Sequence, residues 1–169
     1  MNDRRFSCGL FIGRFQPFHK GHFHVVNYAL NRCDKLIIGL GSTNVIDINN
    51  PIDAKTRDVI IRKSITEWGI DIKKITIVYI NDYPDNDDLW FENIVNVCPK
   101  FDVLFSGNDY VIKVLTDHGI EVIKPTSLSR KSLSGTMIRE KIRSGEEIMD
   151  DIADSAKELI YSKIKKNLE

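Results

Sequence analysis

His19 and His22 are the residues of this chain whose types and spacing are best suited to chemistry. They end a polar turn that follows an apolar run, residues 8–12, and they precede a helical pattern. Two histidines three positions apart at a helix start can face the same way. Free N–H groups and the helix dipole favour phosphate at that place. We therefore predict a role in phosphoryl or nucleotidyl transfer, where positioning and charge stabilisation supply most of the catalysis. The alternative is a pair of surface or cap residues.

The turn before the histidines carries a recognisable motif. Gly13 and Gly21 lack a Cβ and let the main chain come close to a ligand. From Gly13 to His22 the chain reads Gly-Arg-Phe-Gln-Pro-Phe-His-Lys-Gly-His. This resembles the His-x-Gly-His nucleotidyltransferase superfamily, and within it the archaeal-type nicotinamide mononucleotide adenylyltransferases. Phosphopantetheine and cytidylyl transferases more often have Gly-Thr-Phe-Asp at this turn. Arg14 and Gln16 are therefore the residues that distinguish this chain from those enzymes.

A second helix start suited to anions is predicted near residue 134. Ser134 and Thr136 supply hydroxyls on either side of Gly135. Arg139 falls one turn after Thr136 on the same face, so its guanidinium can return to the same phosphate. In isolation this pattern is that of a capped surface helix. It resembles the family's Ser-Gly-Thr-x-Ile-Arg signature, which implies that Ser134, Thr136 and Arg139 hold the ATP triphosphate.

Two further segments match the family in part. Arg57 stands where the family commonly reads Pro-Phe-Thr-Ala-Gly-Glu-Arg, which implies a phosphate ligand; an exposed helix residue is the alternative. Gly107 at the end of the fourth expected strand allows close approach to a ligand. Asp109 could accept hydrogen bonds from ribose hydroxyls, although Asn108 and Asp109 could equally be N-caps. The resemblance to a Ser-Gly-Asn segment implies the adenosine site.

The acceptor side of the site is expected after the second and third strands. Gly41 and Ser42 resemble the family's Gly-Ser in the nicotinamide nucleotide pocket. Asp82 and Trp90 take the positions of an aspartate and a tryptophan that receive the same nucleotide. Trp90 would offer a flat face to a cationic pyridinium ring. The acidic residues between them fit no calcium template.

The resemblance implies three groups of site residues. Catalysis is assigned to His19, His22, Arg57 and Arg139. ATP binding is assigned to Gly13, Arg14, Phe15, Gln16, Phe18, Lys20, Gly21, Gly107, Asn108, Asp109, Ser132, Ser134 and Thr136. Nicotinamide nucleotide binding is assigned to Gly41, Ser42, Asp82 and Trp90. No protein side chain is predicted to bind a metal ion; Mg²⁺ is expected to be held by the ATP phosphates and water.

The composition is that of an ordinary globular protein. The 169 residues are 42% hydrophobic and 28% charged, and 24 basic residues balance 24 acidic ones. No general positive field exists to attract nucleic acid or an anionic membrane, and no apolar run approaches the ~20 residues of a membrane span. The cysteines Cys8, Cys33 and Cys98 have no paired spacing. His24 and His118 lie outside every motif and are interpreted as surface or packing residues. Without a signal-peptide pattern, a cytoplasmic location is expected.

Strand-like and helix-like stretches alternate along the chain. Short runs rich in Ile, Leu and Val predict buried strands at 8–12, 35–40, 75–80, 103–106 and 121–123. Helices are predicted at 21–32, 54–68, 89–97, 110–117 and 134–143, and from 148 to the end. Each strand-helix-strand passage implies a right-handed crossover. We predict one α/β domain over residues 1–169: a doubly wound, Rossmann-like parallel sheet of about five strands over about 1–125, with helices on both faces, and C-terminal helices over 126–169.

The resemblance covers nearly the whole chain and implies one reaction. AMP would pass from ATP to the 5′-phosphate of nicotinamide mononucleotide, giving NAD and pyrophosphate by direct in-line attack. Related enzymes form oligomers, so a homo-oligomer is expected. Two alternatives stay open: adenylyl transfer to another phosphate acceptor such as phosphopantetheine, and a module that senses ATP or NAD without turnover.

Overall fold

Five parallel strands form one sheet in the order β3-β2-β1-β4-β5. The computed structural model describes residues 5–126, 133–148 and 150–166. The strands are β1 (Phe6–Gly13), β2 (Cys33–Leu40), β3 (Ile75–Tyr79), β4 (Val103–Phe105) and β5 (Glu121–Ile123). The strand order reverses at β1, which pairs with β2 on one side and β4 on the other. The predicted α/β class with a doubly wound parallel sheet is confirmed.

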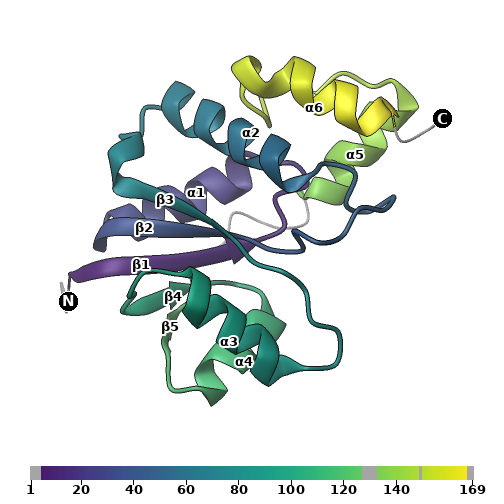
Figure 1. Cartoon of the computed structure of the whole chain (residues 1–169). Coiled ribbons are helices and arrows are strands. Elements are labelled where there is room, and N and C mark those ends of the chain that lie inside the picture. Colours follow the sequence, from purple (N-terminus) through teal and green to yellow (C-terminus); the bar gives the residue numbers. More distant parts are fainter. Residues whose placement is uncertain (1–4, 127–132, 149, 167–169) are drawn as a thin grey trace.

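Helices cover both faces of the sheet (Figure 1). One face carries α1 (Lys20–Leu30), α2 (Ala54–Glu67), α5 (Gly135–Ser144) and α6 (Asp154–Lys166), and the other carries α3 (Asp87–Val97) and α4 (Asp109–Asp117). A single 3₁₀ turn, η1 (Ile72–Lys74), leads into β3. Among the described helices none is long and apolar enough to cross a membrane.

The strands are apolar on both faces because both faces are packed against helices. Leu10 and Ile12 of β1 belong to the core beneath α3 and α4, whereas Phe11 between them belongs to the core beneath the other four helices. Ile37 and Ile38 of β2 divide in the same way. Successive strand residues point to opposite faces, and here each face has a hydrophobic layer to meet.

Helices α1, α2, α3, α4 and α5 begin at the carboxyl edge of the sheet, whereas α6 begins beside the end of α2. Five of them carry a side chain that accepts an N–H group from the first helical turn: His19 for α1, Asp53 for α2, Asn86 for α3, Asn108 for α4 and Ser134 for α5. Because each cap satisfies only one or two of the free N–H groups, the remaining ones are available to an anion.

The C-terminal segment differs from the prediction at one point. The helix expected from residue 148 begins instead at Asp154, because Asp150 has a φ of 42°, which a right-handed helix does not accommodate. The carboxylate of Glu67 accepts the N–H groups of Asp154 and Ser155 and so caps the new start. At the other end, Lys163 lies 2.7 Å from the carboxylate of Asp53. Helix α6 is thus fastened along α2 at both ends.

Candidate active site

A cavity of about 370 Å³ lies at the carboxyl ends of β1 and β4. Its walls come from the turn after β1, the turn after β4, the first turns of α1 and the start of α5. This is the point where the strand order reverses, the usual place for a ligand in an open α/β sheet. The volume is within the range of pockets for small molecules.

His19 and His22 meet in this cavity as a stacked pair. The ring centroids are 3.8 Å apart and the planes differ by 25°. The N–H of Gly21 donates to Nδ1 of His19 at 3.1 Å, and the N–H of His19 donates to Nδ1 of His22 at 3.3 Å. Since each Nδ1 is an acceptor, each neutral ring carries its hydrogen on Nε2. The pair therefore offers two N–H donors from fixed rings.

Both histidines are neutral at pH 7. Burial lowers the pKa of His19 to about 4. Burial, and then repulsion from His19, lowers the pKa of His22 well below its ordinary value. A phosphate bound beside the two rings would raise both pKa values, because a nearby negative charge favours the protonated ring.

Arg139 and the start of α5 face the histidines across the same cavity. One Nη of Arg139 donates to the carbonyl oxygen of Gln16 at 2.7 Å, and the other donates to Oγ1 of Thr136 at 3.2 Å. Its Nε is buried and has no partner in the part of the chain that the structure describes. A Cβ on Gly135 would lie 2.8 Å from the Gln16 carbonyl oxygen, so only glycine lets this turn pack so closely. The N-terminal and C-terminal motifs are thereby held together, with Ser134 as the cap of α5.

Three predicted ATP-site residues support the turn, and two of them, Phe15 and Gln16, also line the cavity. The side-chain amide of Gln16 accepts the N–H of Ile52 at 3.0 Å and donates to its carbonyl oxygen at 2.9 Å, so it is already occupied. Phe18 is fully buried in the core, stacked against His22 and Trp68. Phe15 is buried as well, although it lines the cavity, and it holds a φ of 52°.

The other members of the ATP group lie at different distances from the cavity. Arg14 lines it, and its guanidinium is 3.5 Å from Oδ1 of Asn50. The residues Gly13, Gly21, Gly107, Asn108, Ser134 and Thr136 also line it. Lys20 and Asp109 are exposed and do not line it. Ser132 lies outside the described residues.

Arg57 is placed differently from the expectation of a phosphate ligand. Its side chain is fully buried. One Nη donates to the carbonyl oxygens of Arg14 and Gly41, each at 2.7 Å, and the other donates to that of Ser42 at 3.2 Å. Burial lowers its pKa to about 10, so the guanidinium stays charged at pH 7. A buried group with these partners has no surface left for direct contact with a phosphate.

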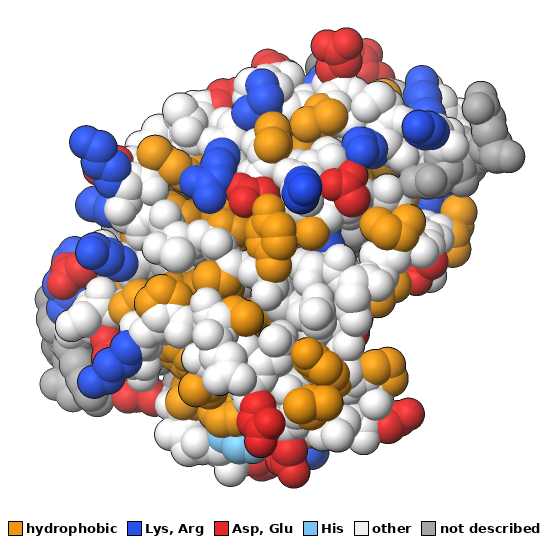
Figure 2. Space-filling view, viewed as in Figure 1, with side chains coloured by type: hydrophobic (Ala, Val, Ile, Leu, Met, Phe, Trp, Pro, Cys, Tyr) orange, Lys and Arg blue, Asp and Glu red, His pale blue; other side chains and the backbone are white. Residues whose placement is uncertain are grey.

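The predicted acceptor residues do not line the cavity. Gly41 and Ser42 are buried after β2, and Asp82 is half-buried after β3. The side-chain amide of Asn44 holds Asp82 by accepting its N–H at 2.8 Å and donating to its carbonyl oxygen at 3.1 Å. Figure 2 shows the surface hollowed on the right, between the part that carries α2 and the part that carries α3 and α4.

Trp90 is a core residue in this structure, contrary to the expectation of an open stacking surface. It is 6% exposed and packs beneath α3 and α4. Its ring centroid lies 5.4 Å from that of Tyr110, which is half exposed. The face predicted to meet a pyridinium ring is therefore covered by protein.

The sequence analysis missed one histidine of the cavity. His24 lines it, and its Nε2 lies 3.1 Å from the carbonyl oxygen of Thr126, which also lines it. His24 stands two positions after His22, a spacing that points side chains in different directions on a helix. No local pattern could have signalled the contact, because Thr126 is remote in sequence.

The polar groups of the cavity suit phosphate better than a bare cation. Arginine, imidazole N–H groups and hydroxyls line it, and all of them donate hydrogen bonds. In the described part of the chain no group of three or more His, Cys, Asp or Glu side chains could hold a metal ion. A divalent cation is compatible with this lining when the phosphates of a nucleotide provide its ligands.

Comparison with known proteins agrees with this geometry. Residues 10–141 match the model of the cytidylyltransferase-like family. The chain is 36% identical over 137 residues to the nicotinamide-nucleotide adenylyltransferase of Saccharolobus solfataricus, covering 80% of this chain and 79% of that one. It is 34% identical over 162 residues to the enzyme of the same name from Thermoplasma acidophilum, covering 95% and 89%.

A solved structure shares the fold. It is a bifunctional NMN adenylyltransferase/ADP ribose pyrophosphatase from Francisella tularensis, complexed with AMP and a manganese ion. The TM-score is 0.78 at 23% identity, over 96% of this chain and 52% of that one, so the present chain spans about half of the bifunctional protein. The chain belongs to the cytidylyltransferase-like family and, within it, to the nicotinamide-nucleotide adenylyltransferases, which makes it an enzyme.

Proposed function

We propose that this enzyme transfers AMP from ATP to the 5′-phosphate of nicotinamide mononucleotide, forming NAD and pyrophosphate. Sequence relatives with this activity in their names support the reaction. The observation that carries the proposal is the meeting of the His19–His22 pair with Arg139 in one cavity at the strand reversal. The cavity supplies N–H donors from two ends of the chain to one anion, which is what a triphosphate needs.

The triphosphate is proposed to lie along the start of α5. Hydroxyls of Ser134 and Thr136 and the free N–H groups of that helix would hold the outer phosphates. Arg139 would turn its unpartnered Nε and its Nη groups toward them. His19 and His22 would then donate from Nε2 to the oxygens of the α-phosphate, where negative charge builds in the transition state.

The reaction needs no covalent intermediate and no general base. A phosphate oxygen of nicotinamide mononucleotide attacks the α-phosphorus, and the bond from that phosphorus to the bridging oxygen of the β-phosphate breaks. Pyrophosphate leaves with the electron pair. A phosphate monoester is already mostly deprotonated at pH 7, so the attacking oxygen has no proton to lose. The protein's task is to align the two nucleotides and to stabilise charge.

Mg²⁺ is proposed as the metal that accompanies ATP. Bound through the phosphates, a divalent cation neutralises charge on the leaving pyrophosphate. The Francisella structure, which holds AMP with a manganese ion, supports divalent metal use in this fold. Within this chain, the donors of Arg139, Thr136 and the histidine pair would orient the same phosphates, so metal and protein would share one ligand.

The acceptor nucleotide is proposed to bind next to Ser42 and Asp82, after the carboxyl ends of β2 and β3. Gly41 and Ser42 would place backbone groups near its phosphate, and Asp82 would face its ribose or cationic ring. Trp90 would contribute to this acceptor site as a buried residue of the core behind it. Stacking on its ring would require Tyr110, its neighbour at 5.4 Å, to move.

A cytoplasmic location and self-association are proposals as well. Cys8, Cys33 and Cys98 are free thiols, as expected in a reducing compartment. Ile46 and Ile48 are 60% and 54% exposed on the loop after β2 and offer apolar surface for a second copy of the chain.

Pyrophosphate release with ATP, Mg²⁺ and one acceptor at a time tests the proposal. Nicotinamide mononucleotide should support fast release and phosphopantetheine should support none above background. Faster release with phosphopantetheine would move the enzyme to a different acceptor. ATP binding without release for any acceptor would make the chain a nucleotide sensor.

A further inference from the structure

Arg57 joins the two loops between which the proposed reaction takes place. One Nη reaches both the carbonyl oxygen of Arg14 after β1 and that of Gly41 after β2, and the other reaches that of Ser42. The backbones of the two loops also meet through the N–H of Gly41, which donates to the carbonyl oxygen of Gly13 at 2.9 Å. One guanidinium therefore supplies three of the hydrogen bonds that set the spacing of these loops.

A buried arginine here is not explained by packing. Taking a guanidinium out of water is costly, and among the described residues the Nε of Arg57 finds no partner that would offset the cost. An apolar side chain of similar length would fill the same volume without this penalty. What an apolar side chain lacks is the rigid fork of donors that can hold several carbonyl oxygens in one plane. The buried arginine thus fixes the geometry of the two loops at a cost in folding free energy.

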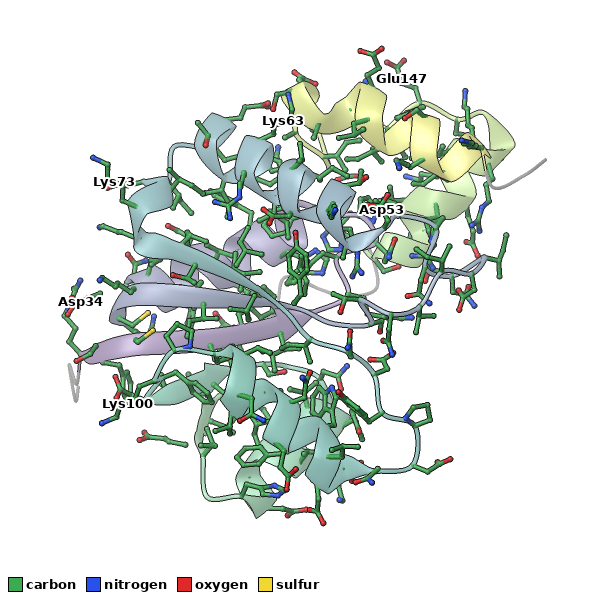
Figure 3. The ribbon with its side chains drawn as sticks, viewed as in Figure 1. Asp34, Asp53, Lys63, Lys73, Lys100 and Glu147 are labelled. Atoms are coloured by element: carbon green, nitrogen blue, oxygen red, sulfur yellow. The ribbon has the colours of Figure 1, made fainter. Side chains whose placement is uncertain are left out.

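The first turn of α2, which carries Arg57, is fixed by contacts with two other parts of the structure. Asp53 caps α2 and lies 2.7 Å from Lys163 of α6, and Figure 3 shows Asp53 where α2 begins. Just before the helix, the backbone of Ile52 is paired with the amide of Gln16. The first turn of α2 is therefore tied to the turn after β1 and to the C-terminal helix. Because this turn is fixed, the guanidinium that it carries can limit the movement of both loops.

We propose that Arg57 is a positioning residue that sets the distance between the ATP phosphates and the acceptor phosphate. The inference rests on the proposed adenylyl transfer. On one side it holds the backbone of Arg14, whose side chain lines the ATP cavity. On the other it holds Gly41 and Ser42, the latter with a φ of 52° that only firm backbone contacts maintain. In-line attack needs the reacting atoms about 3–3.5 Å apart and aligned.

The test compares Arg57→Lys and Arg57→Met with Arg62→Lys. Arg62 is an exposed arginine of the same helix that pairs with Asp58, so it controls for the chemical change alone. Lysine keeps the charge at Arg57 but not the fork, and methionine removes both. ATP dissociation constants, binding stoichiometry, kcat and KM for nicotinamide mononucleotide are measured for each protein, together with its thermal transition.

Arg57→Lys should bind one ATP per chain within about threefold of wild type, because the cavity donors are untouched. Its kcat should fall at least ~10-fold and that of Arg57→Met about 10²-fold, the scale for a misplacement of about 1 Å. Arg62→Lys should match wild type. If kcat falls only as far as the number of ATP molecules bound per chain, the variant contains less folded protein. Arg57 then has a purely structural role, and the inference is wrong. If ATP affinity falls as far as kcat, Arg57 touches the nucleotide and the inference is wrong. Absence of NAD formation by wild type would refute the proposed function instead.

Discussion

The imidazole rings of His19 and His22 stack at 3.8 Å, and the backbone N–H of His19 donates to Nδ1 of its neighbour. The cap residue of α1 thus fixes the tautomer of the next histidine in the same turn. Gly21 makes this possible, because a Cβ there would lie 2.9 Å from Cε1 of His19. Both rings therefore already carry their hydrogen on Nε2, where each can donate a hydrogen bond to a substrate.

His22→Ala should lower kcat by at least ~10²-fold, the scale for losing one preorganised donor at developing charge. His22→Gln should retain more activity than His22→Ala, since its amide N–H can stand near the position of Nε2. Steady-state kinetics on proteins with matched thermal transitions provides the comparison. An alanine variant with most of the wild-type kcat would remove His22 from the mechanism.

Acid should destabilise the fold through His19. Its pKa is about 4 when folded, against an ordinary value of 6.5. Between these values the unfolded chain binds a proton that the folded chain does not, so stability falls as the pH drops from about 6.5 toward 4. From pH 7 to pH 5 the loss from this residue is roughly 1–2 kcal/mol.

Urea unfolding of wild type and His19→Gln at both pH values measures that loss. The glutamine variant does not titrate, so its stability should fall less between pH 7 and pH 5. Equal losses in the two proteins would mean that His19 is already protonated in the folded state at pH 5.

Arg139→Lys should bind ATP more weakly than wild type, and Arg139→Ala more weakly still. Lysine keeps the charge but cannot bridge Gln16 and Thr136 while presenting further N–H groups to a phosphate. The start of α5 should leave both variants some residual affinity. ATP titrations would contradict this account if the alanine variant bound ATP as tightly as wild type.

Gly135→Ala should separate the two halves of the ATP site. The new Cβ would meet the backbone carbonyl oxygen of Gln16 at 2.8 Å, and backbone cannot move aside as a side-chain tip can. We expect a loss of about 1–3 kcal/mol in folding free energy, typical of overpacking, together with weaker ATP binding. Glu140→Ala, an exposed change on the same helix, is the control; identical behaviour of the two variants would refute the close packing.

Trp90→Ala should destabilise the fold by about 3–5 kcal/mol, the cost of removing a large buried aromatic side chain. Both nucleotides should then bind less well in proportion to the unfolded fraction. A stable variant that lost only nicotinamide mononucleotide binding would show instead that the tryptophan ring stacks on the acceptor.

The sequence predicted those site residues whose neighbours in the chain are also their neighbours in space. His19, His22, Ser134 and Arg139 belong to short segments where a helix start is visible in the residue order. The carboxyl ends of the strands were predicted to within one residue, since buried apolar runs stand out before polar turns, whereas β1 and β2 begin two residues earlier than predicted.

The remaining roles depend on contacts between distant residues. Arg57 meets carbonyl oxygens of residues 14, 41 and 42, and Gln16 meets Ile52. Spacing along a helix cannot reveal that the N–H groups of an arginine donate to backbone carbonyl oxygens. Nor can it reveal that Tyr110 covers Trp90. His24 likewise became a cavity residue only through the path of the chain near Thr126.

Transfer of label from ATP carrying ³²P at the α-phosphate tests the central claim most directly. With nicotinamide mononucleotide and Mg²⁺ in a single turnover, all transferred label should appear in NAD, with one unlabelled pyrophosphate released for each NAD formed. Label in free AMP or on the protein, or no labelled NAD at all, would contradict direct adenylyl transfer by this cavity.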